Sequence, residues 1–433
     1  MTIPTTRRAV MVSSHDQFGE LLAQVLSPSR PLQSEELLRG RQHQMADLRK
    51  AFYQPGRHVL IHGLRGVGKT SLAQTAAFSL ASHSDPILVG CEEGSTLFSV
   101  IREIFEFSEQ RNPKIRERVR EISGGFSRFG VNAAGTVQQT EGPVAEPGST
   151  NDAVRLASHL CDIYDRDPII VIDEFDLIKD ESEQKRFVGF VKQISDRHIP
   201  IKFIFCGIGE SPESIMAAHA SAGRIFHTVG LGQLPWEARE EILGEAADRV
   251  GITVDRSTSL RIARISDGFP HYVHFLAEKL FWRVFEDREA NGVAGHFHFQ
   301  NAMNDASEAM DIELKGPYQK AIQKYNDDYE GVLWAVADGH ELVRRSTDVF
   351  ENYERIMRSI DREPLDRKKF NQRINSLKSP AHASILKGSR SGWYEFTEKM
   401  IWGYVRLRAE RAGVSLDRDH PAAQSKSYTS YGK

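Results

Sequence analysis

Cysteine is scarce in this sequence, and long apolar runs are missing. The three cysteines, Cys91, Cys161 and Cys206, lie far apart and form no C-x-x-C pair. This spacing argues against a zinc site and a disulfide framework, and it favours a reducing compartment. No run reaches the roughly 18 apolar residues that a membrane span requires, and no continuous apolar segment follows Arg7 and Arg8 as it does in a signal peptide. We therefore expect a cytoplasmic protein that does not enter a membrane.

Length and charge distribution suggest several domains with different surfaces. A chain of 433 residues is too long for one ordinary core and predicts two or three domains. Its hydrophobic content of 40% and charged content of 27% are typical of soluble globular proteins. The net charge of −3 hides an asymmetry, because residues 362–411 carry twelve Lys and Arg against five Asp and Glu. The rest of the chain is acidic.

A short apolar run followed by a glycine-rich loop is the most informative stretch. Val59, Leu60 and Ile61 predict a buried parallel strand, and Ser71–Leu80 predicts a helix. Between them, residues 63–70 match G-x-x-x-x-G-K-[ST] at every fixed position. The glycines let successive N–H groups converge on phosphate oxygens, Lys69 would reach the β- and γ-phosphates, and Thr70 would ligate Mg²⁺. The alternative is a glycine-rich turn without a ligand. The nucleotide-binding residues predicted here are Gly63, Gly66, Val67, Gly68, Lys69, Thr70 and Ser71.

A second motif, which is acidic, lies about 100 residues after the glycine-rich loop. Pro168–Ile172 predicts a buried central strand, and Asp173 and Glu174 stand at its carboxyl end, where α/β sheets place ligands. The motif resembles the Walker B motif of hydrolysing ATPases. This resemblance implies that Asp173 holds Mg²⁺, directly or through water, and that Glu174 polarises the attacking water.

Three further elements resemble parts of AAA+ and STAND ATPases, and a fourth departs from their pattern. Gly40-Arg41 resembles the adenine-side box, although an ordinary packing helix would also explain it. Arg224, just before the last core strand, matches the arginine-finger position; the alternatives are a surface arginine and an intramolecular salt bridge. Gly268-Phe-Pro270 resembles the lid element that packs over the nucleotide, but His271 replaces the usual arginine and is expected to have a packing role. The sensor after the fourth strand lacks Asn or Thr, which leaves Glu210 and Ser211 as candidates.

The C-terminal pattern predicts three helices and a hairpin. The helices are expected at Tyr325–Ala337, Val349–Ile360 and Pro364–Leu377, and the strand pair at Ser384–Phe396. This order resembles a winged helix, and a final helix should follow at about Glu398–Arg411. On the third helix Phe370, Ile374 and Leu377 share one face. The DNA-binding side chains predicted on the other face and at the wing turn are Lys368, Lys369, Asn371, Gln372, Asn375 and Arg390, with Lys387 beside the last.

Together these resemblances predict an α/β P-loop NTPase core with a parallel sheet, followed by a helical lid and a C-terminal winged-helix domain. The expected boundaries are 1–36 for an N-terminal extension, 37–235 for the AAA+ core with an insertion at 124–150, 236–314 for the lid, 315–412 for the winged helix and 413–433 for a disordered tail. The insertion could contact a partner or be a disordered loop. Replication initiators of the origin-recognition type share this domain order.

The resemblance implies a slow, Mg²⁺-dependent ATPase whose nucleotide state controls assembly into a ring or filament. The first hypothesis is that it binds duplex DNA through the winged helix. The alternative is a STAND-like signalling or defence ATPase whose winged helix docks an effector or client protein. A scaffold that binds ATP without hydrolysis is a third possibility, but the Asp173-Glu174 pair argues against it.

Overall fold

The computed structural model describes residues 14–81, 85–111, 146–164, 167–208, 222–310, 312–322, 328–339 and 341–416. Most of the predicted insertion and all of 417–433 lie outside these residues, as do the sensor candidates Glu210 and Ser211. The chain divides into two compact units, one of residues 31–232 and one that joins residues 1–30 to 233–433. In the described residues no helix is both long and apolar enough to span a bilayer.

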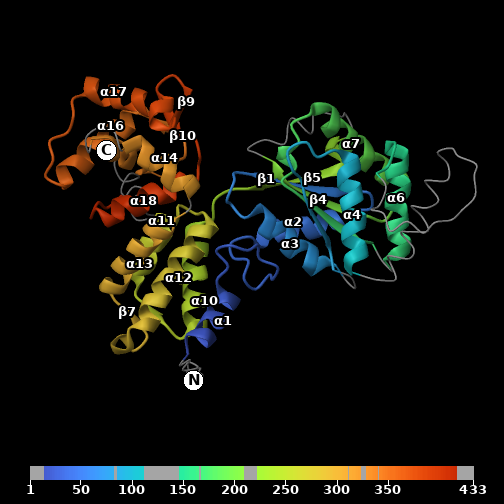
Figure 1. The fold of residues 1–433 in the computed structure, drawn as a ribbon, viewed down its shortest axis with the longest axis horizontal. Coiled ribbons are helices and arrows are strands. Elements are labelled where there is room, and N and C mark those ends of the chain that lie inside the picture. The colour runs from blue at the N-terminus through green and yellow to red at the C-terminus, as the bar shows by residue number, and fades with distance from the viewer. Residues whose placement is uncertain are drawn as a thin grey trace, which may run out of the picture. The chain divides into compact units, whose positions relative to one another are not determined.

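Residues 31–232 form an α/β unit around a five-stranded parallel sheet (Figure 1). The strand order is β2-β3-β4-β1-β5, which places the glycine-rich loop after a strand with a neighbour on each side. The strands are β1 (His58–Gly63), β2 (Ile87–Gly90), β3 (Ile169–Asp173), β4 (Lys202–Ile208) and β5 (Phe226–Leu231). The described helices are α2 (Gln42–Phe52), α3 (Lys69–Leu80), α4 (Leu97–Arg111), α6 (Thr150–Ile163), α7 (Glu181–Asp196) and α9 (Ala222–Ile225), with the 3₁₀ turn η1 (Phe175–Leu177). The predicted α/β class with a parallel sheet is confirmed.

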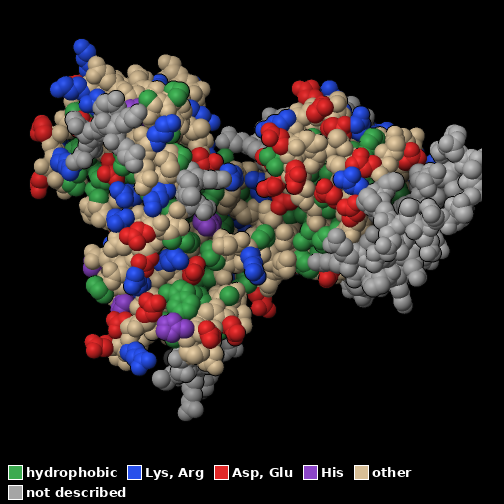
Figure 2. All heavy atoms as spheres, in the orientation of Figure 1, with side chains coloured by type: hydrophobic (Ala, Val, Ile, Leu, Met, Phe, Trp, Pro, Cys, Tyr) green, Lys and Arg blue, Asp and Glu red, His purple; other side chains and the backbone are tan. Residues whose placement is uncertain are grey.

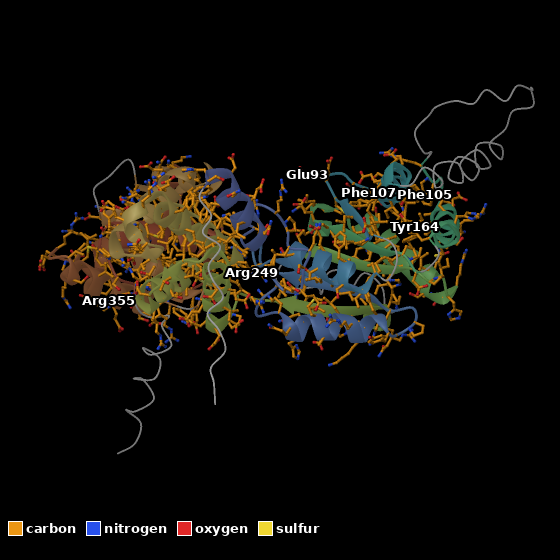
Figure 3. The ribbon with its side chains drawn as sticks, turned by 90° about the horizontal axis from the view of Figure 1, so that it is seen from below. Glu93, Phe105, Phe107, Tyr164, Arg249 and Arg355 are labelled. Carbon is orange, nitrogen blue, oxygen red and sulfur yellow. The ribbon has the colours of Figure 1, made fainter. Side chains whose placement is uncertain are left out.

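Helices bury both faces of this sheet, as a parallel sheet requires. Alternate strand residues such as Leu60, Ile172 and Phe205 belong to the core that α4, α6 and α7 close on one face. The P-loop helix α3 contacts β1, β3 and β4. At the far edge, α4 and α6 lie side by side, with Phe105 and Tyr164 close together in Figure 3. The Tyr164 hydroxyl donates to Ser108 Oγ at 3.1 Å, which gives this partly buried ring a polar anchor.

The second unit begins with a helical bundle. It contains α1 (His15–Val25), α10 (Trp236–Val250), α11 (Arg256–Ser266), α12 (Pro270–Glu286) and α13 (His296–Ala309), with η2 (Arg288–Ala290) and the paired strands β6 (Thr253–Val254) and β7 (Val293–Ala294). The N-terminal helix α1 packs on this bundle by stacking Phe18 on Phe285, with ring centroids 4.1 Å apart. His271 packs within this unit, as expected. Its Nδ1 lies 2.8 Å from the Pro28 carbonyl oxygen, and its ring stacks on Phe275.

The remainder of the second unit contains the predicted helices and hairpin. Its elements are α14 (Ile312–Ile322), α15 (Asp328–Ala337), β8 (Arg344–Arg345), α16 (Ser346–Ser359), α17 (Arg367–Leu377), η3 (Pro380–His382), β9 (Leu386–Arg390), β10 (Trp393–Phe396) and α18 (Ile401–Arg411). Phe370, Ile374 and Leu377 are fully buried, so the predicted core face of α17 is confirmed.

Two details of this region differ from what the sequence pattern predicts. The sheet has a third strand, β8, which pairs with β10. Only two residues form it, so it is too short to produce a visible alternation in the sequence. The chain also stays packed beyond 412, because Val414 and Leu416 are only 2% and 4% exposed.

Candidate nucleotide-binding site

The glycine-rich loop has the backbone that only glycine tolerates well. Gly63, Gly66 and Gly68 have φ of 145°, 82° and 94°, a region that strains residues with a side chain. A Cβ on Gly63 would lie 2.1 Å from the Leu231 carbonyl oxygen, so β1 approaches β5 too closely for alanine. Gly68 is the N-cap of α3, and the loop therefore ends at a helix N-terminus, where free N–H groups and the helix dipole favour an anion.

Lys69, the first residue of α3, extends back over its own loop. Its Nζ donates to the Gly63 and Leu64 carbonyl oxygens at 2.9 and 2.8 Å. Burial lowers the pKa of Lys69, while the nearby carboxylates of Asp176 and Asp173 act in the opposite direction. A phosphate would supply a stronger charged partner than the two neutral carbonyls that now hold the ammonium group.

The acidic pair lies at the carboxyl end of β3, two strands away from β1. Asp173 Oδ1 accepts from the Glu174 amide at 2.9 Å, which holds the carboxylate at the end of the strand. Glu174 is exposed and has φ of 54° and ψ of 33°, a left-handed conformation that is uncommon outside glycine. Such strain persists only where the surroundings over-determine it.

Two neighbours impose this conformation on Glu174. Phe175 is 2% exposed and packs edge-on against Phe187 and Phe205, both at 5.1 Å, which anchors the next residue in the core. Gly207, at the end of β4, approaches so closely that a Cβ there would lie 2.6 Å from Glu174 Cα. The left-handed turn therefore directs the Glu174 side chain out of the core at the edge where the P-loop ends.

Cys206 is a member of this site that motif matching missed. Its Sγ lies 2.9 Å from Asp173 Oδ1, within hydrogen-bond distance. Burial, and then the Asp173 charge, raises the pKa of the thiol well above its usual value, so the group stays protonated and acts as a donor. No local sequence signal identifies it, because its contact with Asp173 depends on the place of β4 between β1 and β3 in the sheet.

Arg41 holds the loop from the side. The side chain is buried, and its guanidinium donates to the Val67 carbonyl oxygen at 3.0 Å and to the Gly232 carbonyl oxygen at 2.7 Å. Burial lowers its pKa to about 10, which leaves it charged at neutral pH. Gly40 precedes it with φ of 67°. In this arrangement Arg41 joins the P-loop to the end of β5 through backbone contacts.

The remaining predicted residues of the loop differ in their burial. Val67 is fully buried, whereas Thr70 and Ser71 are half-buried in the first turn of α3. Ser71 Oγ accepts from the Leu32 amide at 3.2 Å and so ties down the segment that enters the unit.

The oxygen donors suit a hard cation such as Mg²⁺. Thr70 offers a hydroxyl at the head of α3, and Asp173 offers a carboxylate at the end of β3. Mg²⁺ is usually bound through one or two protein oxygens, with phosphates and water completing its shell. Within the described part of the chain no cluster of three or more His, Cys, Asp or Glu side chains could hold a metal by itself.

Arg224 lies at the opposite edge of the sheet from the P-loop. It is exposed in the short helix α9, two residues before Phe226, which pairs with His58 at the start of β1. The loop leaves the other end of β1, and six residues of strand span about 20 Å. Arg224 is therefore too distant to serve the nucleotide site of its own subunit. Pro270, at the first position of α12, belongs to the other unit.

The predicted DNA-contacting face of α17 is mostly exposed. Lys368, Lys369, Gln372 and Asn375 point to solvent, and Figure 2 shows Lys and Arg side chains gathered over this part of the molecule (upper left). Asn371 is less accessible than these four: it is half-buried, and its Oδ1 has no hydrogen-bond partner among the described residues. Its position, one residue after the buried Phe370, lies at the border of the core face.

The hairpin of β9 and β10, predicted as the wing, is basic and aromatic at its turn. Arg390 is exposed and lies over the Trp393 ring, with its guanidinium carbon 3.9 Å from the centroid, and Arg345 lies over the same ring at 5.4 Å. Lys387 is exposed beside them and 3.6 Å from Glu395.

Comparison with known proteins agrees with this geometry. Residues 37–203 match the AAA ATPase domain family. No curated protein sequence matches the chain. The Walker-type ATPase PABY2304 of Pyrococcus abyssi superposes with a TM-score of 0.51 at 16% identity, covering 88% of this chain and 99% of that one. This likeness concerns the fold alone.

Two other solved structures are more distant. Cdc6p of Pyrobaculum aerophilum has a TM-score of 0.42 at 13% identity, covering 90% of this chain and 98% of that one. The Orc1 protein of Aeropyrum pernix, solved in complex with DNA, has a TM-score of 0.40 at 16% identity, covering 87% and 93%. Scores this low carry no argument about fold or function.

The family match includes the glycine-rich loop, the Asp173-Glu174 pair and the Gly40-Arg41 element. The resemblance to P-loop ATPases of the AAA+ type is thereby confirmed, because residues 37–203 of this chain match the AAA ATPase domain family.

Proposed function

We propose that this protein is a Mg²⁺-dependent ATPase whose nucleotide state controls its assembly and its binding to duplex DNA. The observation that carries the proposal is the convergence of Lys69, Asp173 and Glu174 at the carboxyl edge of one parallel sheet. The P-loop amides and Lys69 would bind the β- and γ-phosphates. Thr70 and Asp173 would hold Mg²⁺, which when bound neutralises charge on the phosphate oxygens.

Three residues around the nucleotide would have different roles in hydrolysis. Glu174, whose side chain is exposed, would orient a water molecule and accept its proton. Cys206 would keep Asp173 in place through its thiol. Arg41 would set the position of the loop from the side, which makes its contribution to nucleotide binding indirect.

Binding of duplex DNA would use the C-terminal helices and hairpin as a winged helix. The element order, with α17 before the β9–β10 hairpin, supports this reading. The exposed Lys368, Lys369, Gln372 and Asn375 could contact phosphates and base edges. Arg390 at the wing turn would contact the phosphate backbone of the DNA beside the helix. The alternative remains a STAND-like switch in which the same surface docks an effector or client protein.

Assembly of the purified chain separates the two hypotheses. We expect rings or filaments with a non-hydrolysable ATP analogue, and we expect duplex DNA to promote them. The measurement is electron microscopy of the full chain with and without analogue and DNA. Assembly that needs the analogue but is indifferent to DNA would favour the protein-docking switch.

Arg224 is expected to act in trans, because it lies at the edge of the sheet remote from its own P-loop. Arg224→Ala should bind ATP normally and hydrolyse it poorly. Mixing it with Lys69→Ala should restore part of the activity, since some interfaces then pair an intact site with an intact arginine. The readout is phosphate release as a function of mixing ratio.

A matched control is Arg155→Ala, which removes an exposed arginine from α6 and should leave the rate unchanged. Failure of the mixture to recover any activity, in subunits shown to co-assemble, would exclude the trans role.

A further inference from the structure

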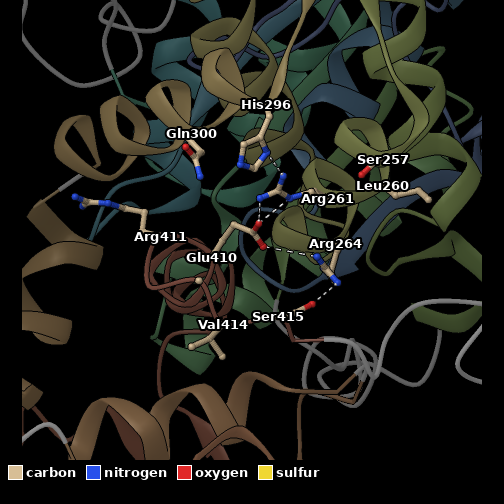
Figure 4. Close-up of a pocket in the computed structure, with 11 residues that line it drawn as sticks. Ser257, Leu260, Arg261, Arg264, His296, Gln300, Glu410, Arg411, Val414 and Ser415 are labelled. Carbon is tan, nitrogen blue, oxygen red and sulfur yellow. Dashed lines mark hydrogen bonds and ion pairs between the residues drawn. The ribbon is translucent and has the colours of Figure 1, made fainter. Parts of the chain in front are cut away.

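A basic pocket lies among α11, α13 and the end of α18, all within the second unit (Figure 4). Its volume is about 600 Å³. Three arginines line it. Arg261 and Arg264 from α11 face the Glu410 carboxylate, whereas Arg411 from α18 donates to Asn304 and Ser307 at the border of the pocket. The net charge of these four side chains is positive. None of the residues of the nucleotide site contributes to this pocket.

Glu410 already shows how the pocket holds an oxyanion. Arg261 donates to its Oε1 from Nε at 2.7 Å and from a second guanidinium nitrogen, and Arg264 lies 3.6 Å from its Oε2 (Figure 4). Two guanidinium groups therefore flank one carboxylate in the geometry that favours carboxylate and phosphate groups. The Arg261 fork is itself fixed by stacking on Phe299, 4.0 Å from the ring centroid.

The helix that carries Glu410 also disfavours a negative charge at this position. It lies in the last turn of α18, where the helix dipole is negative and disfavours a carboxylate. Its position depends on Arg261 and Arg264. A ligand with a stronger anion can compete for the same guanidinium groups.

One helix N-terminus adds to the attraction for anions. His296 is the first residue of α13 and lines the pocket, so the positive end of that helix dipole borders it. Ser257, in the first turn of α11, also lines the pocket, but the Asp255 carboxylate already caps that helix by accepting from the Thr258 amide. Gln300, one turn further along α13, is exposed at the rim and offers an amide to the body of a ligand.

We propose that this pocket binds a phosphomonoester of about nucleotide size. A phosphate carries roughly −1.5 to −2 charges at neutral pH, which matches the excess positive charge of the three arginines over Glu410. The volume lies in the range of about 300 to 1,000 Å³ that is usual for small-molecule sites, so the phosphate would not be the whole ligand. The ligand would join helices of residues 236–314 to α18 and could thereby stabilise their packing.

The test is isothermal titration calorimetry with AMP and with inorganic phosphate as probes. The full chain carries Lys69→Ala, so that binding at the P-loop does not contribute. We expect saturable binding, tighter for AMP than for phosphate. Adding Arg264→Gln should weaken AMP binding about tenfold or more through the lost charged hydrogen bonds. Adding Glu410→Gln should strengthen it several-fold, because the internal competitor loses its charge.

The matched control is Arg288→Gln, which removes an exposed arginine of the same unit outside the pocket and should not change binding. Opposite effects of Arg264→Gln and Glu410→Gln are not expected of residues with a purely structural role. If Arg264→Gln fails to fold, the gain from Glu410→Gln still decides the matter. Absence of saturable AMP binding, equal affinity in all variants, or AMP binding no tighter than phosphate would overturn the proposal.

Discussion

Glu174→Gln is expected to slow ATP hydrolysis by about 10²–10⁴-fold, the usual contribution of a general base. The amide keeps the shape of the side chain but cannot accept the proton of the attacking water. Glu174 is exposed and its left-handed backbone is set by Phe175 and Gly207, so the substitution should not disturb the fold. ATP binding should therefore be retained, as measured with a fluorescent analogue beside phosphate release.

Two variants make this result interpretable. Lys69→Ala should lose tight ATP binding, because the phosphate charge loses its partner in the loop. Glu181→Gln neutralises another exposed carboxylate a few residues away, at the start of α7, and should behave as the unmodified chain. A normal hydrolysis rate in Glu174→Gln would show that the acidic pair has been misassigned as a Walker B motif.

Replacing Lys368 and Lys369 together by Glu is expected to cost several kcal/mol of DNA-binding free energy, or roughly 10²-fold or more in affinity. Both side chains are exposed on α17, so the loss combines missing phosphate contacts with new repulsion. ATP hydrolysis without DNA should remain nearly intact. The measurement is fluorescence anisotropy on duplex DNA with ATP across a salt series, and binding by the unmodified chain should weaken steeply as salt rises.

The control must make the same change in net charge elsewhere. Lys185 on α7 is exposed and Lys192 on the same helix is partly exposed, and replacing both by Glu makes the same change in net charge far along the chain from α17. This variant should retain most of the affinity. Equal binding by the unmodified chain and the Lys368/Lys369 variant at low salt would remove α17 from the DNA-binding surface and favour the protein-docking hypothesis.

Local pattern predicted most elements of the core because its signals are short-range. The P-loop needs glycines at backbone positions with positive φ, and Gly63, Gly66 and Gly68 have them. The apolar run before Asp173 predicted a strand that is buried along its length. Period 3.6 on α17 identified Phe370, Ile374 and Leu377 as buried, but the period alone does not decide how much of Asn371, at the border of that face, the neighbouring elements cover.

The sequence by itself determined the strand, loop and helix that can hold a nucleotide, and the acidic pair expected to act on it, since each depends on residues within a few positions of one another. Only the tertiary structure decided what surrounds them. In the sheet β4 lies between β1 and β3, which brings Cys206 to Asp173 and Gly207 to Glu174. This pairing of strands is long-range, and no local pattern encodes it. The same holds for the basic pocket, in which Arg261 and Glu410 are 149 positions apart and meet because α11 packs on α18.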